Sequence, residues 1–401
     1  MQTLSAPSKL SSQNTRQSRP RAFILPAGFS GCAWWRFRLP FAKLQKLGCG
    51  MEIIVADNAE KHVSMAQIQR FTDEADIVAM QAPGNMDGLM LIQMYRSTGK
   101  RVVVDYDDYS FDLSPGNPRY AELGIKECEV LGANGEVAFK WRDGENGFNL
   151  RANVAKYEMF LRCVKEADLV TVTTDYLAEK FRRQARAVAI CPNSIDFDLW
   201  KPIKRPPSLD GQVRVGWFGG DSHLEDLAVF KTLLPRLCRK YPQVKIVISS
   251  SPVPQWKTIF SEVPNGQLEW HNWAELKHYT LLLASRQWDV GLIPLAENEF
   301  SRCKSNIKVL ELAALRVPVV AQAMIPYSNY VRHGETGFLA RSEEEWFEHA
   351  CGLIESRGLR ESVGEAAYAD AFADYNLDSN CRMWEKAYTD LRGAPHGDGK
   401  T

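Results

Sequence analysis

Ten short runs of apolar and β-branched residues, arranged in two series, constrain the fold of this 401-residue chain more than any other feature. Within each run the apolar residues are continuous rather than alternating, which is typical of parallel strands covered by helices on both faces. Longer segments with helical periodicity separate the runs. The first series lies at 22–27, 52–57, 76–83, 101–108, 168–174 and 188–193, and the second at 213–219, 244–251, 288–295 and 317–322.

The two series predict an α/β protein with two doubly wound, Rossmann-like domains that face a cleft. A single core rarely extends over a chain of this length, so two domains are also the expectation from size. We expect these boundaries: a disordered basic tail over 1–21, the first domain over 22–200, a proline-bearing linker over 201–212, the second domain over 213–365, helices that pack back on the first domain over 366–392, and a second disordered tail over 393–401.

Bulk composition excludes several classes of protein. Lys+Arg and Asp+Glu both total 49, and this balance disfavours a protein whose main partner is DNA or another polyanion. The nine cysteines stand singly, without zinc-ligand spacing, as in a reduced cytosolic protein. We find no run long enough for a membrane span and no apolar signal-peptide core, so a cytoplasmic location is expected.

The segment KSNIKVLELAALRVPVV (304–320) predicts an amphipathic helix that leads into a buried strand. Lys304, Lys308 and Glu311 are offset by four and seven residues, so they share one helix face. The helix would begin with three amides directed into the cleft, those of Ser305, Asn306 and Ile307. Cations and free amides suit a diphosphate, and a carboxylate suits the two hydroxyls of a ribose. An ordinary solvated charged face is the alternative interpretation.

A second phosphate-binding turn is predicted where the run VRVGWFGG ends. Gly219 and Gly220 would let the backbone approach a ligand closely, and a helix is expected to begin near Ser222. Asp221 and His223 would either contact the ligand or cap that helix. The turn lacks both the Gly-x-Gly-x-x-Gly pattern and a Walker lysine, which disfavours nicotinamide dinucleotides and P-loop chemistry.

In the first domain, the run VVVDYDD places three carboxylates at the end of a parallel strand, where α/β proteins gather their chemistry: Asp105, Asp107 and Asp108. At least one of them is expected to cap a turn, and Asp107 or Asp108 to reach a substrate. Residues 112–150 interrupt the first series, and we expect them to form a flap or loop over the cleft.

These segments together resemble the GT-B glycosyltransferases, in particular the large family 4. Its nucleotide-sugar signature is a helix bearing a glutamate, then a Gly-x-Pro-Val-Val strand and a Gly-x-x-Gly turn. The corresponding pieces here are Glu311, RVPVV (316–320) and GETG (334–337). PNSIDFDLW (192–200) is similar to the Pro-Asn-Gly-Ile-Asp that ends the first domain of the family. The chain departs from the family at Cys303, which stands where a first glutamate contacts the sugar, and it lacks the usual Arg/Lys diphosphate pair.

The resemblance implies a hexosyltransferase-like enzyme that moves a sugar from a nucleotide-sugar donor, most often a UDP-sugar, to an acceptor with retention of configuration. The acceptor would be a carbohydrate, a lipid-linked sugar or a modified base. The family implies no metal and no other cofactor, although Asp-x-Asp is also the metal motif of GT-A enzymes. Residues 26–48 resemble the loop and helix that line the acceptor side, and imply acceptor contacts for Gly28, Gly31, Arg36 and, unless it belongs to the core, Trp34.

Three other functions remain open from the sequence. A sugar-nucleotide epimerase would use the same cleft without a separate acceptor. A GT-B-like binding protein without turnover would explain the missing glutamate at 303. A glycosyltransferase of the bacteriophage type, acting on a modified DNA base, would keep the chemistry and change the acceptor, and the neutral net charge counts against it.

Overall fold

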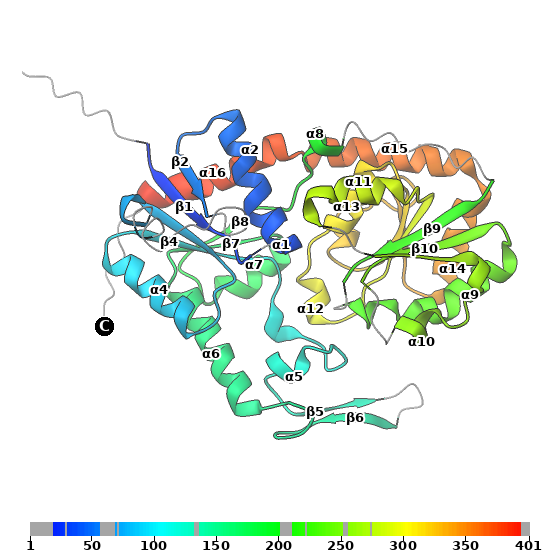
Figure 1. Cartoon of the computed structure of the whole chain (residues 1–401), viewed down its shortest axis with the longest axis horizontal. Coiled ribbons are helices and arrows are strands. Elements are labelled where there is room, and N and C mark those ends of the chain that lie inside the picture. Colours follow the sequence, from blue (N-terminus) through cyan, green and yellow to red (C-terminus); the bar gives the residue numbers. More distant parts are fainter. Residues whose placement is uncertain are drawn as a thin grey trace, which may run out of the picture.

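Two parallel six-stranded sheets, each flanked by helices, lie side by side in the computed structural model (Figure 1). The structure describes residues 19–28, 30–56, 69, 72–131, 136–200, 211–220, 223–251, 256–272 and 275–393. Most of the predicted linker (201–210) and of the two predicted tails (1–18 and 394–401) therefore lies outside the described residues.

The first sheet has the strand order β2-β1-β3-β4-β7-β8, with every neighbouring pair parallel. The order reverses beside β1, which makes the ends of β1 and β3 a topological switch point. Its strands are β1 Arg21–Leu25, β2 Glu52–Val55, β3 Ile77–Gln81, β4 Arg101–Tyr106, β7 Leu169–Val172 and β8 Val188–Ile190. The accompanying helices are α1 Gly31–Ala33, the π-helical turn η1 Trp34–Arg38, α2 Leu39–Leu47, α4 Met86–Ser97, α6 Leu150–Glu166, α7 Asp175–Arg182 and α8 Phe197–Trp200.

The second sheet has the order β11-β10-β9-β12-β13-β14, again parallel throughout, and its switch point lies between β9 and β12. Its strands are β9 Val213–Phe218, β10 Val244–Ser249, β11 Leu268–His271, β12 Val290–Ile293, β13 Val319–Gln322 and β14 Phe338–Ala340. The helices are η4 Asp226–Val229, α9 Phe230–Lys240, α10 Trp256–Phe260, η5 Asn265–Gln267, η6 Leu276–His278, α11 Tyr279–Ser285, α12 Glu299–Arg302, α13 Ile307–Ala314, η7 Tyr327–Asn329, α14 Glu343–Glu355 and α15 Arg357–Asp374.

Every predicted run contains or overlaps an observed strand, so the α/β class with two doubly wound sheets is confirmed. Strands β3 and β4 are buried along their whole length, which explains their continuously apolar sequences. The helix start predicted near Ser222 falls on residues that the structure does not describe; after them, η4 begins at Asp226 and α9 at Phe230. Asp221 and Ser222 themselves lie outside the described residues.

The last helix, α16 (Leu377–Gly393), returns to the first domain and lies against α2, whereas α15 lies along the second domain (Figure 1). Aromatic rings join α16 to the first domain: Trp384 lies 5.6 Å from Phe41 and 6.0 Å from Phe37, centroid to centroid. Trp384 and Tyr388 are buried in the same core as Phe41. The end of the chain therefore completes the hydrophobic core near its beginning.

The segment that interrupts the first series forms its own small unit below the two sheets in Figure 1. It contains η2 Ser110–Asp112, α5 Tyr120–Leu123 and an antiparallel hairpin, β5 Cys128–Leu131 with β6 Val137–Trp141. Its small core includes Phe300 of the second domain beside Tyr120, Trp141 and Phe148. Within the described residues, no helix is long and apolar enough to cross a membrane.

Candidate active site

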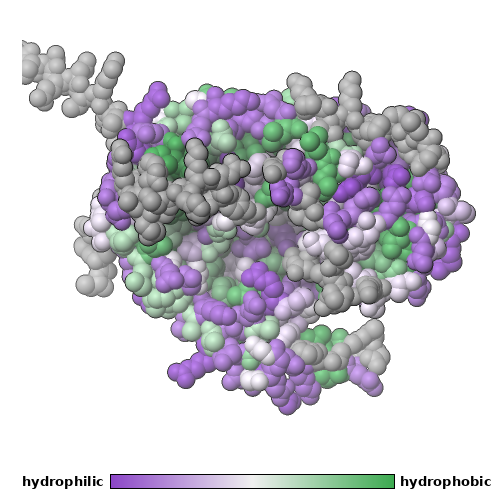
Figure 2. Space-filling model, in the orientation of Figure 1, coloured by the Kyte–Doolittle hydropathy of each residue, from purple (hydrophilic) through white to green (hydrophobic). Residues whose placement is uncertain are grey.

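The two sheets meet where their strands end. The segments after β1, β4 and β8 of the first sheet approach the segments after β9 and β12 of the second. In Figure 2 the molecular surface is hollowed between the two halves, above the inserted segment. The segments after β1, β9 and β12 leave their sheets at the switch points, which is where open α/β sheets bind ligands.

On the second-domain side, Lys308 is the first of a series of polar groups that contact one another. Its Nζ lies 3.0 Å from Nε2 of His223, and His223 Nδ1 lies 2.5 Å from Oδ2 of Asp226. The other Asp226 oxygen accepts from the Ala296 amide at 2.8 Å. Burial lowers the pKa of His223 to about 4, with the nearby Lys308 charge acting in the same direction, so the imidazole is neutral. Burial also lowers the pKa of Lys308 to about 7. Asp226 thus fixes His223, and His223 fixes Lys308.

Gly219 is required for Lys308 to lie there. A Cβ at this position would be 2.9 Å from Lys308 Nζ and 2.7 Å from the Trp217 ring. Lys308 Nζ also lies 5.1 Å from the centroid of the Trp217 ring. Gly220 is exposed with open space around it. The group that lies close to Gly219 is therefore the lysine, and the predicted ligand contact of the glycine pair stays a prediction.

Glu311 lies one turn further along α13 and is almost completely buried, with 2% of its surface exposed. The Tyr279 hydroxyl donates a hydrogen bond to its carboxylate. Its Oε1 has no hydrogen-bond partner among the described residues. Burial raises the pKa of Glu311 to about 8, against the opposing effects of Tyr279 and Lys308. A buried carboxylate oxygen without a partner is costly, and a hydroxyl donor from a ligand would satisfy it.

The start of α13 differs slightly from the prediction. The helix begins at Ile307, with Asn306 in the capping position and no side-chain cap. Within the described part of the chain, the amides of three successive residues have no hydrogen-bond acceptor, namely Ser305, Asn306 and Ile307. Such amides attract anions, and the helix dipole adds to the effect. Lys304 lies just before them, with its Nζ 4.2 Å from the centroid of the Phe300 ring.

On the first-domain side, Asp107 and Asp108 follow β4 and are both half-buried. Burial, reinforced by the charge of Asp108, raises the pKa of Asp107 to about 6. The Cys32 thiol at the start of α1 donates a hydrogen bond to Asp107. Asp108 accepts from the Ser110 hydroxyl at 2.9 Å, as expected for a carboxylate that caps a turn. Lys304 is close enough to act electrostatically on Cys32, so the acidic strand end faces the segment just before α13.

The glycine loop after β1 is open. Gly28 has φ +91°, a conformation that favours glycine, and a Cβ at either Gly28 or Gly31 would meet nothing within 4 Å. Trp34 is partly buried against the first-domain core, with part of its surface left exposed. The loop therefore leaves room for an acceptor beside Asp107.

Arg36 corrects the sequence interpretation. We expected its side chain to face the cleft, but it is completely buried (0% exposed) and fully engaged. Its Nε and Nη2 donate to the two oxygens of Asp105 at 3.0 and 2.8 Å. Its guanidinium carbon lies 4.5 Å from the centroid of the Trp384 ring. Arg36 and Asp105 thus form a buried ion pair under the cleft and cannot themselves contact an acceptor.

The inserted segment spans the cleft. Ser114 donates to Glu225 of the second domain at 2.5 Å, and Gly116 lies so close to this carboxylate that a Cβ would collide with it. In a second bridge, Tyr176 and Lys180 of α7 both reach Glu299 of α12 at 2.8 Å. Cys303, which replaces the first glutamate of the family, is completely buried within the first-domain core.

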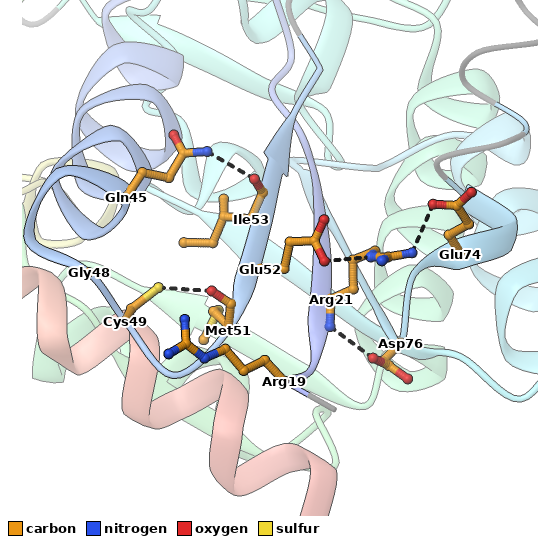
Figure 3. A pocket seen from close by; sticks show the side chains of 10 residues that line it. All are labelled: Arg19, Arg21, Gln45, Gly48, Cys49, Met51, Glu52, Ile53, Glu74 and Asp76. Carbon is orange, nitrogen blue, oxygen red and sulfur yellow. Dashed lines mark hydrogen bonds and ion pairs between the residues drawn. The ribbon is translucent and has the colours of Figure 1, made fainter. Parts of the chain in front are cut away.

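Two other features lie away from the cleft. A cavity of about 730 Å³ opens at the amino-terminal edge of the first sheet, where Arg21 pairs with Glu52 and Glu74 (Figure 3). Its charges are neutralised internally. One group of three carboxylates also gathers among the described residues, but Lys43 pairs with each of them at 2.7 to 3.2 Å: Asp196, Asp198 and Asp378.

Some site residues were not anticipated from the sequence. Asp226 and Tyr279 act only as partners of His223 and Glu311, and no motif marks them. Asn193 lies in the segment PNSID that carried the family resemblance, but its hydrogen bond to Ser305 (2.9 Å) is visible only in the structure.

Comparison with protein-family models and with curated proteins finds no significant match. Solved structures do match along the whole chain. A sucrose-phosphate synthase from Thermosynechococcus elongatus has a TM-score of 0.63 at 12% identity, covering 94% of this chain and 100% of that chain. HepE from Anabaena, in complex with UDP and glucose, has a TM-score of 0.62 at 14% identity, with 92% and 100% covered. A glycosyltransferase from Rickettsia africae has a TM-score of 0.61 at 10% identity, with 94% and 100% covered.

These similarities, together with the two parallel sheets, show that the chain has the GT-B fold, two Rossmann-like domains facing a cleft. The resemblance to GT-B glycosyltransferases noted in the sequence is therefore confirmed at the level of the fold. At these identities the comparisons do not extend to a particular donor or acceptor.

Proposed function

We propose that this protein is a glycosyltransferase that moves a sugar from a nucleotide-sugar donor, a UDP-sugar, to a hydroxyl of an acceptor. The diphosphate would lie against Lys304, Lys308 and the free amides at the start of α13, beside Gly219 and Gly220. The ribose would hydrogen-bond with Glu311. The acceptor would enter beside Gly28, Gly31 and Trp34.

One observation carries the proposal: Glu311 is buried with an unpartnered oxygen, one turn from a lysine held at the start of a helix with free amides. A buried carboxyl group with one unpartnered oxygen and a desolvated lysine destabilise a free protein. Both are explained if a ligand brings hydroxyl donors to the first and negative charge to the second. A nucleoside diphosphate has this combination, and the complex of HepE with UDP and glucose supports the choice of UDP.

In the reaction, the bond between the sugar C1 and the diphosphate oxygen breaks, and a bond from C1 to the acceptor oxygen forms. Lys304, Lys308 and the helix dipole would stabilise the negative charge that develops on the leaving diphosphate. The acceptor proton would pass to that diphosphate or to Asp107, whose pKa of about 6 suits proton transfer near neutral pH. We propose attack from the face that the diphosphate leaves, with retention of configuration and without a metal.

Calorimetry with uridine and UDP tests the donor site. Glu311→Ala should weaken the binding of both by about 1–3 kcal/mol, the usual cost of unpairing buried polar groups. Lys304→Met and Lys308→Met should weaken UDP binding and leave uridine almost unaffected. Equal losses for uridine and UDP in the lysine variants would contradict the assignment of the diphosphate to α13.

A binding protein without turnover is the second candidate, and the buried Cys303 favours it, because the family's sugar-contacting glutamate is missing and its place is closed. Release of UDP from UDP-sugars, screened with sugar acceptors and with EDTA present, separates the two. Turnover that resists EDTA supports the metal-free transferase. Tight UDP binding with no turnover of any donor would support the binding protein, and turnover restored only by Mn²⁺ would contradict the mechanism.

A further inference from the structure

A chain of hydrogen bonds joins the two domains beneath the candidate site. Arg36 Nη1 donates to Oδ1 of Asn193 at 3.1 Å, and Asn193 Nδ2 donates to Oγ of Ser305 at 2.9 Å. Asn193 follows β8 of the first domain, whereas Ser305 lies just before α13 of the second. Asn193 is buried, with 6% of its surface exposed, so water does not compete freely for these bonds.

The first-domain end of this chain is rigid. The Arg36 guanidinium is held by both oxygens of Asp105, and the Thr171 hydroxyl donates to Asp105 at 2.7 Å. Planar bidentate pairing of this kind fixes orientation as well as distance. Asp105 lies in β4, and Asp107 follows two residues later, just after the strand, so the anchor of the hydrogen-bond chain also supports the proposed acid/base group.

The second-domain end of the chain lies in the donor site. Ser305 is one of the residues whose amides are free at the start of α13. An asparagine side chain suits this bridge because its amide carries an acceptor and a donor on one short planar group. Leucine could supply neither bond, and alanine could not reach either partner.

We propose that Asn193 is a positioning residue that sets the distance between the start of the donor helix and the first-domain carboxylates in the closed cleft. The proposal rests on the proposed function. Because the nucleotide is bound by second-domain groups, loss of the bridge leaves nucleotide affinity intact and slows the step that needs both domains. A displacement of about 1 Å can reduce catalysis on the order of 100-fold.

Asn380 provides a matched control. It is an asparagine of nearly the same burial (8% exposed), and its Nδ2 donates to Oγ of Ser194, the residue next to Asn193, at 3.0 Å, and to the carbonyl of Asp374 at 2.9 Å. It therefore fixes the same loop, but it connects this loop with α16 and the end of α15 and not with α13.

The experiment compares Asn193→Ala with Asn380→Ala. In Asn193→Ala, kcat for UDP release from the donor that the wild type uses should fall by roughly 10- to 100-fold. Its Kd for UDP should stay within about threefold of the wild type, less than half a decade of affinity. Asn380→Ala should lower the midpoint of thermal unfolding about as much as Asn193→Ala does, and it should leave kcat unchanged. Equal losses of kcat in the two variants, or a loss of UDP affinity with kcat preserved, would overturn the positioning role.

Ser305→Ala tests the bridge from its other end, and it serves if Asn193→Ala does not fold. Both changes remove the same hydrogen bond, so the loss of kcat in the double variant should be smaller than the product of the single losses. Fully multiplicative losses would show that Asn193 acts independently of Ser305 and would contradict the bridge.

Hydrogen exchange provides a readout that does not depend on turnover. In the protein without ligand, the amides of Val309 and Leu310, whose hydrogen bonds to Asn306 begin α13, should exchange faster in Asn193→Ala than in wild type, and at the wild-type rate in Asn380→Ala. Faster exchange without turnover of any sugar nucleotide would keep the bridge and reject the glycosyltransferase. Turnover in the wild type with unchanged exchange in Asn193→Ala would keep the glycosyltransferase and reject the bridge.

Discussion

Among single residues, Glu311 shows how a site prepared for a ligand affects the stability of the free protein. Its folded pKa of about 8 exceeds the ordinary value of 4.5, so the folded state holds a proton that the unfolded state releases between these values. By linkage, the contribution of this group is fully present below about pH 4.5 and is lost as the pH rises towards 8.

We therefore expect Glu311→Gln to gain stability relative to the wild type as the pH rises. The glutamine keeps the size of the side chain but has no proton to lose. Urea unfolding of both proteins at pH 5 and pH 8 measures this, and the difference in unfolding free energy between variant and wild type should be larger at pH 8. A difference that is the same at both pH values would show that Glu311 titrates normally.

A second prediction concerns the carboxylates of Asp107 and Asp108. Asp107→Asn should reduce kcat by about 100-fold or more if Asp107 accepts the acceptor proton. In the wild type, kcat/KM should rise with pH through about 6, the pKa of Asp107. Asp108→Asn removes the neighbouring negative charge that raises this pKa, so the rise of kcat/KM with pH should occur at lower pH in this variant. A rise at the same pH as in the wild type would mean that another group controls the pH dependence.

Single residues also mark the limit of what the sequence reveals about the site. The face that carries Lys308 and Glu311 follows from helical spacing, and the structure places both residues at the cleft. The burial of Arg36 does not follow, because its partners Asp105 and Asn193 are 69 and 157 residues away. An arginine after a glycine loop has the same local sequence whether it faces a ligand or a buried carboxylate.

Among the elements, the inserted segment shows how an attached unit gains stability from the other domain. Phe300 of α12 is buried beside Tyr120, Trp141 and Phe148 in the small core of the insertion. A two-stranded hairpin is marginal by itself. The packing of Phe300 therefore ties the insertion to the second domain.

We expect Phe300→Ala to destabilise the insertion before the rest of the protein. Removal of a buried phenylalanine typically costs about 3–5 kcal/mol. Limited proteolysis should then cleave the β5–β6 region first, while both sheets remain intact. Phe372→Ala is the control, since Phe372 is 49% exposed and its loss should change little. Resistance of the insertion in Phe300→Ala would show that its contacts with the first domain are sufficient.

Strands with continuously apolar sequences were the ones recognised, and they include the edge strand β8, whose residues are only partly buried. Strands such as β4 are recognisable because six successive residues are buried. Strand β11, with the sequence LEWH, escaped because Glu269 and His271 interrupt the apolar run at the edge of the sheet. The β5–β6 hairpin escaped because its stabilising contacts are with α5, Phe148 and Phe300 rather than within its own sequence.

For the whole molecule, the crossing of α16 makes the two domains depend on each other. Trp384 covers the Arg36–Asp105 pair and packs on Phe37 and Phe41. We expect Trp384→Ala to lower stability by about 3–5 kcal/mol, and both domains to unfold together at a lower temperature. Calorimetry measures this, with the neighbouring Met383→Ala (44% exposed) as the control. Two separate transitions already in the wild type, or an unchanged transition in Trp384→Ala, would show that α16 does not couple the domains.

The position of Cys303 has a practical consequence. Its side chain belongs to the second domain by sequence but is completely buried in the first-domain core, and burial raises the pKa of its thiol to about 12. A reagent can alkylate this thiol only while α12 has separated from the first domain. The rate at which Cys303 is alkylated therefore measures how often the cleft opens, and no engineered label is needed. A ligand that holds the two domains together should lower this rate.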